Sequence, residues 1–221
     1  MIKEETFLKT SKKYDLIWIG EIHGIKENYR AYKEIIGKLS KNGFKNIIWE
    51  MKSDFSERSN DSEDGRMNPF AVSFLKWMNN KIRMGELEKL TFLDAVKNKD
   101  SKHLSDDEIM AIELIDNIKN KKNIIITGNF HMGGPLNVRE NIEPCLDFVK
   151  SKANLKILKI GMKYAGGHFY NFGVRKLSKD FYFGDKENLD FGTITKNRDK
   201  DIFFFHVGRA HPVFKNPTTR K

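Results

Sequence analysis

Short runs of consecutive apolar residues, separated by amphipathic stretches, constrain the fold of this 221-residue chain more than any other feature. They occupy residues 16–19, 46–51, 123–127 and 155–160. The runs are rich in β-branched residues, a pattern typical of strands that are buried on both faces. Between them, apolar residues recur at helical spacing in residues 27–39, 69–84 and 105–118. Strands that alternate with helices predict an α/β fold, with a largely parallel central sheet flanked by helices.

The pattern changes after about residue 161, where short aromatic-rich strand candidates follow one another without helices between them. They lie at residues 166–177, 180–185 and 201–208. We expect these segments to be additional C-terminal strands that extend or flank the sheet with some antiparallel pairing. The chain is interpreted as one domain, residues 1–221, with a polar loop at 52–68, and only Gly161 offers a weak boundary for two domains.

The composition narrows the function without deciding it. Hydrophobic residues make up 39% of the chain, enough for a sizeable core, and the formal net charge is +10. Lysines are spread along the chain, and zinc-finger spacing and RNA-recognition aromatic motifs are absent, so no specific nucleic-acid partner is predicted. No stretch approaches the roughly 18 apolar residues of a membrane-spanning helix. Because the start lacks a long apolar run and Cys145 is the one cysteine, we expect a cytoplasmic protein.

Three apolar runs end in the same motif, Gly-x-x-His, at residues 20–23, 128–131 and 208–211. In open α/β sheets, ligands bind in the crevice beyond the carboxyl ends of the strands. Glycine lets the backbone turn sharply at such an end, and the histidine that follows can project into the crevice. If the strands are parallel neighbours, the imidazoles meet at one edge of the sheet.

Two carboxylates accompany these histidines. Glu21 lies inside the first motif, and Glu50 ends the second apolar run, where a buried carboxylate is costly unless it is paired, protonated or bound. His23, Glu50 and His131 can hold a divalent metal ion with open positions for water. Alternatively, a histidine that a carboxylate orients can act as general base on water without a metal. Both alternatives predict hydrolysis.

The stretches GEIHG, NIIWEM, ITGNFHMGGP and GRAHPV resemble the superfamily that joins the Tiki-type metalloproteases, the ChaN-like haem-uptake proteins, the TraB-type proteins and the erythromycin esterases. The similarity covers most of the chain through sparse motifs. It implies an α/β fold whose site lies at strand ends, and it matches Glu21, His23, Glu50 and His131 to the functional positions. Arg30 matches a basic residue of some members. The spacing between Glu21 and His23 is closer to the ChaN-like and Tiki branches than to the erythromycin esterases.

We therefore predict a hydrolase of ester or amide bonds that acts on a small-molecule or peptide substrate, with those four matched residues as its catalytic set. A divalent metal is the expected cofactor if one is used. The alternative is a non-catalytic haem- or metal-binding protein of the ChaN-like type, for which His211 and Arg30 are candidate cofactor-binding residues. The sequence leaves the substrate, the metal and the oligomeric state open.

The remaining histidines have simpler interpretations. His206 interrupts an aromatic strand and is expected to be a core histidine. His168 is expected to have a structural role, such as capping a turn, with a place at the rim of the site as the alternative. His103 lies in a loop of Lys, Asp and Ser residues and is expected to be solvated. The apolar stripe of residues 70–78 is expected to be core packing, with a lid over the substrate as the alternative.

Overall fold

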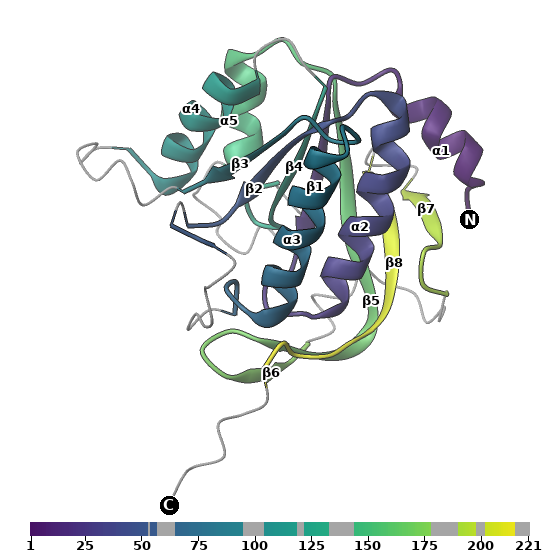
Figure 1. Ribbon diagram of the computed structural model, residues 1–221, viewed down its shortest axis with the longest axis vertical. Helices are drawn as coiled ribbons and strands as arrows, with labels where there is room; N and C mark the ends of the chain where they lie inside the picture. Colours follow the sequence, from purple (N-terminus) through teal and green to yellow (C-terminus); the bar gives the residue numbers. More distant parts are fainter. Residues whose placement is uncertain are drawn as a thin grey trace, which may run out of the picture.

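The computed structural model describes residues 1–52, 54–56, 65–94, 104–118, 122–132, 144–177, 190–197 and 202–214. These residues form an eight-stranded sheet with helices on both faces (Figure 1). The strands are β1 (Leu16–Glu21), β2 (Asn46–Glu50), β3 (Lys89–Leu93), β4 (Asn123–Gly128), β5 (Ile157–Tyr170), β6 (Val174–Lys176), β7 (Ile194–Asn197) and β8 (Ile202–Ala210). The helices are α1 (Glu4–Ser11), α2 (Glu27–Leu39), α3 (Pro69–Arg83), α4 (Asp106–Ile118) and α5 (Cys145–Lys152), with a 3-10 turn at Ser40–Asn42.

The central sheet is mostly parallel, as the alternation of apolar runs and helices predicts. The strand order is β3-β2-β4-β1-β5-β8-β7, and β6 pairs with β5 beside this path. The pairs along the path from β3 to β8 are all parallel, and β7 joins β8 antiparallel. The carboxyl ends of β1, β2 and β4 therefore point to one edge, where Glu21 pairs in register with Gly128.

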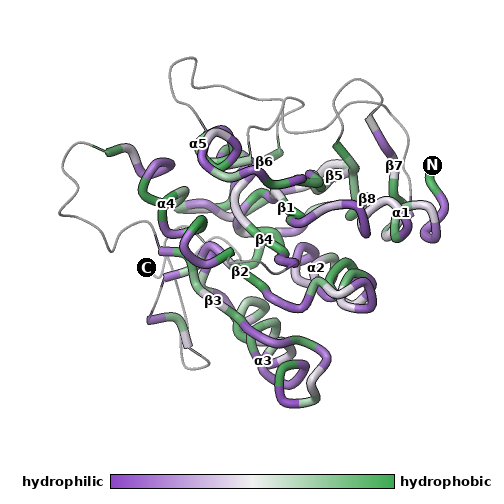
Figure 2. Tube along the Cα trace, turned by 90° about the horizontal axis from the view of Figure 1, so that it is seen from above, coloured by the Kyte–Doolittle hydropathy of each residue, from purple (hydrophilic) through white to green (hydrophobic). Residues whose placement is uncertain are grey.

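Each central strand is buried on both faces because helices cover both faces of the sheet. Ile17 and Ile19 of β1 pack into the core beneath α2 and α3, whereas Leu16 and Trp18 pack into the core beneath α4 and α5. Figure 2 shows α2 and α3 on one side of the strands and α4 and α5 on the other. This arrangement explains why the strand sequences are continuously apolar instead of alternating.

The C-terminal strands extend the central sheet, as expected. The fourth apolar run predicts a strand that ends at residue 160, but β5 continues through Gly161 to Tyr170. Gly161 is buried, and a side chain added there would lie 3.1 Å from the Phe204 ring of β8. The glycine at this position therefore lets two paired strands, β5 and β8, pack closely.

Several expectations fall wholly or partly outside the described residues. They concern His103, the strand candidate at 180–185 and most of the polar loop at 52–68. His206 is buried, as expected, and its ring lies 3.0 Å from the Thr195 hydroxyl. Within the described ranges, no helix is long and apolar enough to cross a membrane.

Candidate active site

The first strand end places Glu21 and His23 side by side. Glu21 is the last residue of β1, and its carboxylate contacts Nδ1 of His23 two residues later. Asn28, in the first turn of α2, donates from Nδ2 to the other Glu21 oxygen. The Tyr164 hydroxyl of β5 donates in turn to the Asn28 carbonyl oxygen at 2.7 Å. A buried chain of polar groups thus fixes the carboxylate that holds the His23 ring.

The turn that carries His23 is held from the other side by the β5–β6 hairpin. Gly24 has φ +76°, and a side chain there would overlap the Tyr170 carbonyl at 1.9 Å. The Tyr170 amide donates to the Gly24 carbonyl at 3.1 Å. The glycine after the histidine is therefore required by a close backbone approach, which orients the loop at the strand end.

Glu50 lies between the imidazoles of His23 and His131. It ends β2, its side chain is 7% exposed, and its Oε2 accepts the backbone amide of Gly128 at 2.8 Å. Its Oε1 accepts the Arg66 guanidinium at 2.9 Å. The same Oε1 lies 3.8 Å from Nε2 of His23 and 3.6 Å from Nε2 of His131. Both imidazoles therefore face one buried carboxylate oxygen.

His131 is held by a carboxylate that the sequence did not suggest. Nδ1 of His131 lies 2.7 Å from Oδ1 of Asp107, in the first turn of α4. That oxygen also accepts the amide of Cys145, the first residue of α5, at 3.0 Å. Ser105 and Glu108 bond each other as a capping box at the start of this helix, and that pattern does not involve Asp107. The sequence signal for Asp107 is that the first turn of α4 carries more acidic residues than a capping box needs.

Two histidine–carboxylate pairs, Glu21 with His23 and Asp107 with His131, therefore converge on Glu50 from opposite sides. These five residues are called the Glu50 cluster. The carboxylates are more deeply buried than the rings: the Glu21 and Asp107 side chains are 8% and 12% exposed, against 28% for His23 and 21% for His131. Solvent and a substrate can thus reach the imidazoles, while the acids orient them from behind.

Gly128 separates the two rings. A side chain at this position would lie 3.1 Å from Nε2 of His23 and 3.7 Å from the His131 ring. The second Gly-x-x-His motif therefore contributes more than a turn, because its glycine leaves the space into which both imidazoles fit. Its amide also binds Glu50, so one residue organises three side chains.

The electrostatics of the cluster follow from its burial and its charge pairs. Burial alone would raise the pKa of Glu50, but the His131 hydrogen bond and the charges of His23, His131 and Arg66 outweigh it and lower that pKa. Burial would lower the pKa of His131, but hydrogen bonds to Asp107 and Glu50 raise it to about 10. The pKa of His23 is also raised, because Glu21 and Glu50 outweigh burial. His131 is therefore an imidazolium at neutral pH.

The described arrangement does not fit the predicted metal site. No group of three or more His, Cys, Asp or Glu side chains among the described residues is arranged to hold a metal ion. The Glu50 oxygen that faces both rings already accepts Arg66. An ion there would compete with the guanidinium and would need a deprotonated His131. The ligand set of His23, Glu50 and His131 stays a prediction.

Haem ligation needs an imidazole nitrogen that can approach the iron. In both His23 and His131, Nδ1 contacts a carboxylate and Nε2 is turned toward Glu50. The described geometry offers no support for the haem alternative, which also stays a prediction.

The structure joins four of the predicted site residues and places two others apart. Nδ1 of His211 lies 2.8 Å from Oε1 of Glu27 at the start of α2, and the His211 side chain is 51% exposed. The Arg30 guanidinium lies 3.8 Å over the Phe191 ring. No contact recorded among the described residues links His211 or Arg30 to the Glu50 cluster. Their predicted role in cofactor binding stays a prediction.

Comparisons with known proteins give no family. No protein-family model and no curated protein matches the chain. Among solved structures, the type III effector HopBA1 is similar with a TM-score of 0.48 and 11% identity, over 94% of both chains. RRSP, a MARTX toxin effector domain from Vibrio vulnificus, is similar with a TM-score of 0.43 and 18% identity, over 72% of this chain and 36% of that one. These similarities are too low to assign the chain to a family.

Proposed function

We propose that this protein is a hydrolase that cleaves an ester or amide bond at the Glu50 cluster. One observation carries the proposal: two partly exposed imidazoles, each held at Nδ1 by a buried carboxylate, turn their Nε2 atoms toward the same point at a strand-end edge. A purely structural histidine gains nothing from a second one opposite it. A base that takes a proton from water and an acid that protonates the leaving group both accelerate hydrolysis.

The pKa shifts favour different roles for the two rings. The raised pKa of His23 makes its neutral form a stronger base, suited to taking a proton from water. His131, protonated at neutral pH, can give a proton to the leaving oxygen or nitrogen and stabilise negative charge on the substrate. Water adds to the carbonyl carbon, the bond to the leaving group breaks, and both rings return to their starting state after proton exchange with solvent. Glu50 holds the two rings at their working separation.

The decisive test compares turnover and folding in His23→Ala and His131→Ala. Each variant should lose about 10²–10⁴-fold in kcat/KM on p-nitrophenyl acetate or fluorescently labelled casein, the range for loss of a proton-transfer group. Circular dichroism should show a folded chain in both. Full activity in either variant would contradict the proposal.

Metal and haem are tested on the same protein. Elemental analysis of chelator-free protein and turnover in EDTA decide whether an ion takes part, and a haem titration followed at the Soret band decides the alternative function. Under the proposal, activity survives EDTA. Loss of activity in EDTA that a divalent ion restores would replace the metal-free mechanism with the predicted metal site.

A further inference from the structure

The two outermost strands of the sheet, β7 and β3, differ in whether a described segment pairs with their outer side. At one edge, β7 is paired on its outer side by the start of the chain, where the Ile2 amide donates to the Ile194 carbonyl at 2.8 Å. At the other edge, β3 pairs with β2, and no other described strand lies beside it. The outer amides and carbonyls of such a strand can add a further strand from another chain.

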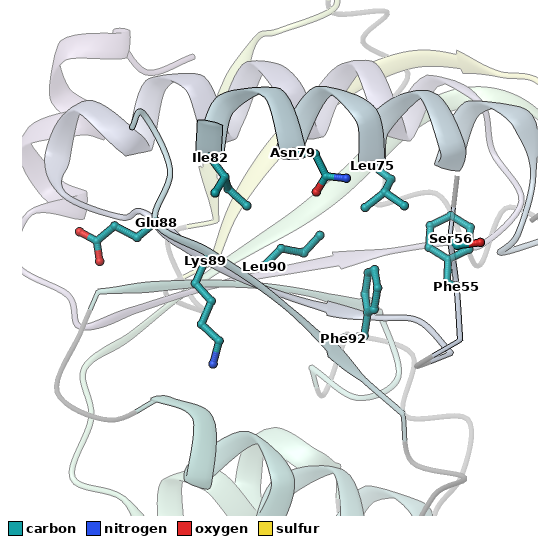
Figure 3. A pocket seen from close by; sticks show the side chains of 9 residues that line it. All are labelled: Phe55, Ser56, Leu75, Asn79, Ile82, Glu88, Lys89, Leu90 and Phe92. Atoms are coloured by element: carbon teal, nitrogen blue, oxygen red, sulfur yellow. The ribbon is translucent and has the colours of Figure 1, made fainter. Parts of the chain in front are cut away.

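An apolar groove runs beside β3, the strand that has no described neighbour on its outer side. A cavity of about 520 Å³ lies between α3 and β3. In Figure 3, Leu75 and Ile82 of α3 face Leu90 and Phe92 of β3, and Phe55 closes one end. Leu90 and Phe92 are two residues apart, so they share one face of the strand, whereas Lys89 points away from the helix. The strand side of the groove therefore presents apolar side chains at the two-residue repeat of an extended chain.

We propose that this groove docks an extended polypeptide segment as an added strand along β3. The inference rests on the proposed function and names its substrate class as a polypeptide. An open strand edge recognises repeated backbone amides and carbonyls, while the apolar groove beside it accepts alternate side chains. A small ester, a lipid surface and a nucleic acid all lack that backbone repeat.

A segment docked along β3 would point toward the carboxyl ends of the strands, where the Glu50 cluster lies. Leu93, the last residue of β3, pairs in register with Glu50 of β2. An added strand would lie about 10 Å from β2, two strand spacings across the sheet. At about 3.3 Å per residue, a chain that leaves the groove at this end needs about three to five residues to reach Glu50. The cleaved bond should therefore lie that far from the docked segment.

Binding is measured first, because it does not depend on turnover. The probe is a fluorescein-labelled ten-residue peptide of alternating valine and threonine with terminal lysines, added to the full chain carrying His23→Ala. Methylation of alternate backbone nitrogens removes hydrogen-bond donors and keeps every side chain. Two forms are compared: one is methylated on the amides that would pair with β3, and the other on the amides that point away from it. Fluorescence anisotropy should show at least about tenfold weaker binding of the first form. Equal binding of both methylated forms and the parent peptide would overturn the proposal.

A matched pair of variants localises the site. Asn79 lines the groove from α3 and is exposed, so Asn79→Trp should fill the groove without unfolding the chain. Asn80, exposed on the same helix but outside the groove lining, gives the control Asn80→Trp. We expect Asn79→Trp to raise KM for labelled casein about tenfold and to leave p-nitrophenyl acetate turnover unchanged, with Asn80→Trp near wild type on both.

The outcomes separate the two proposals. Peptide binding that Asn79→Trp weakens, in a protein that hydrolyses nothing, would retain the docking groove and remove the hydrolase. Ester hydrolysis that His23→Ala abolishes, with casein KM and peptide binding unaffected by Asn79→Trp, would retain the hydrolase and remove the groove. Mapping the cleaved peptides by mass spectrometry then tests the predicted distance of the cut from the docked segment.

Discussion

At the residue scale, the site depends on how each charge is compensated. Glu50 stays ionised in a buried position because an amide, a guanidinium and two imidazoles surround it. His131 stays protonated because carboxylates flank it at both nitrogens. Such groups hold one another in their charged forms, so loss of any one changes the protonation of the rest.

Asp107→Asn should lower the pKa of His131, because the amide keeps a hydrogen-bonding oxygen but removes the negative charge. Loss of an opposite charge at this distance is worth roughly one to three pKa units. The raised pKa of His131, about 10, should set the alkaline limb of the kcat profile in the wild type, and in Asp107→Asn that limb should move to lower pH by this amount. The control is Asp106→Asn, an exposed neighbour in the same turn. An unchanged alkaline limb in Asp107→Asn would separate Asp107 from the reaction.

At the element scale, strand ends and helix starts position the side chains of the proposed active site. The strands could be predicted because continuous apolar runs allow few alternatives, and α2 has the predicted bounds of residues 27–39. Glu21, His23, Glu50 and His131 could be predicted to meet because parallel strands bring their carboxyl ends to one edge. The position of Asp107 could not be predicted in this way, because Asp107 lies on a helix and not at the end of a strand.

The elements that escaped prediction share a physical cause. Asp107 reaches His131 through the packing of α4 against the strand end, a long-range contact without local periodicity. Arg66 comes from the polar loop at 52–68, whose composition indicates only solvation. The extension of β5 past Gly161 depends on pairing with β8, some 40 residues later, and tertiary pairing overrides the turn tendency of glycine.

Gly128→Ala tests the strand end as a spacer. Strand backbone accepts alanine, and the amide to Glu50 remains, but the new Cβ would lie 3.1 Å from Nε2 of His23. Displacement of the ring should cost about tenfold or more in kcat with little change in the free energy of unfolding. Gly37→Ala in α2 meets nothing within 4 Å and should stabilise the protein by about 0.5–1 kcal/mol with normal activity. Equal activity of both variants would remove the spacer role.

At the scale of the whole molecule, the cluster makes stability depend on pH. The folded-state pKa of His131 lies above its ordinary value of about 6.5, so its contribution is complete below that pH and is lost as the pH rises through about 10. The pKa of Glu50 is lowered, so its contribution is present above about pH 4.5 and is lost as the pH falls toward the folded-state value. These two groups together favour stability near neutral pH.

Urea unfolding at pH 7 and pH 10 measures the His131 contribution. The free energy of unfolding of the wild type should fall between these values, and that of His131→Gln should fall less, because the variant lacks the group that titrates. The difference between the decrease in the wild type and the decrease in His131→Gln isolates the contribution of His131, because the lysines and tyrosines titrate in both proteins. Equal decreases would show that His131 is not protonated in the folded protein at neutral pH.

The two histidines of the proposed site are anchored from opposite faces of the sheet. Asn28 of α2 secures the first imidazole through Glu21, whereas Asp107 of α4 secures the second from the opposite face of the sheet. Sliding of one helical layer past the other would change the gap between the rings directly. If the proposed hydrolysis is correct, its rate should therefore depend on how the two helical layers are aligned across the sheet.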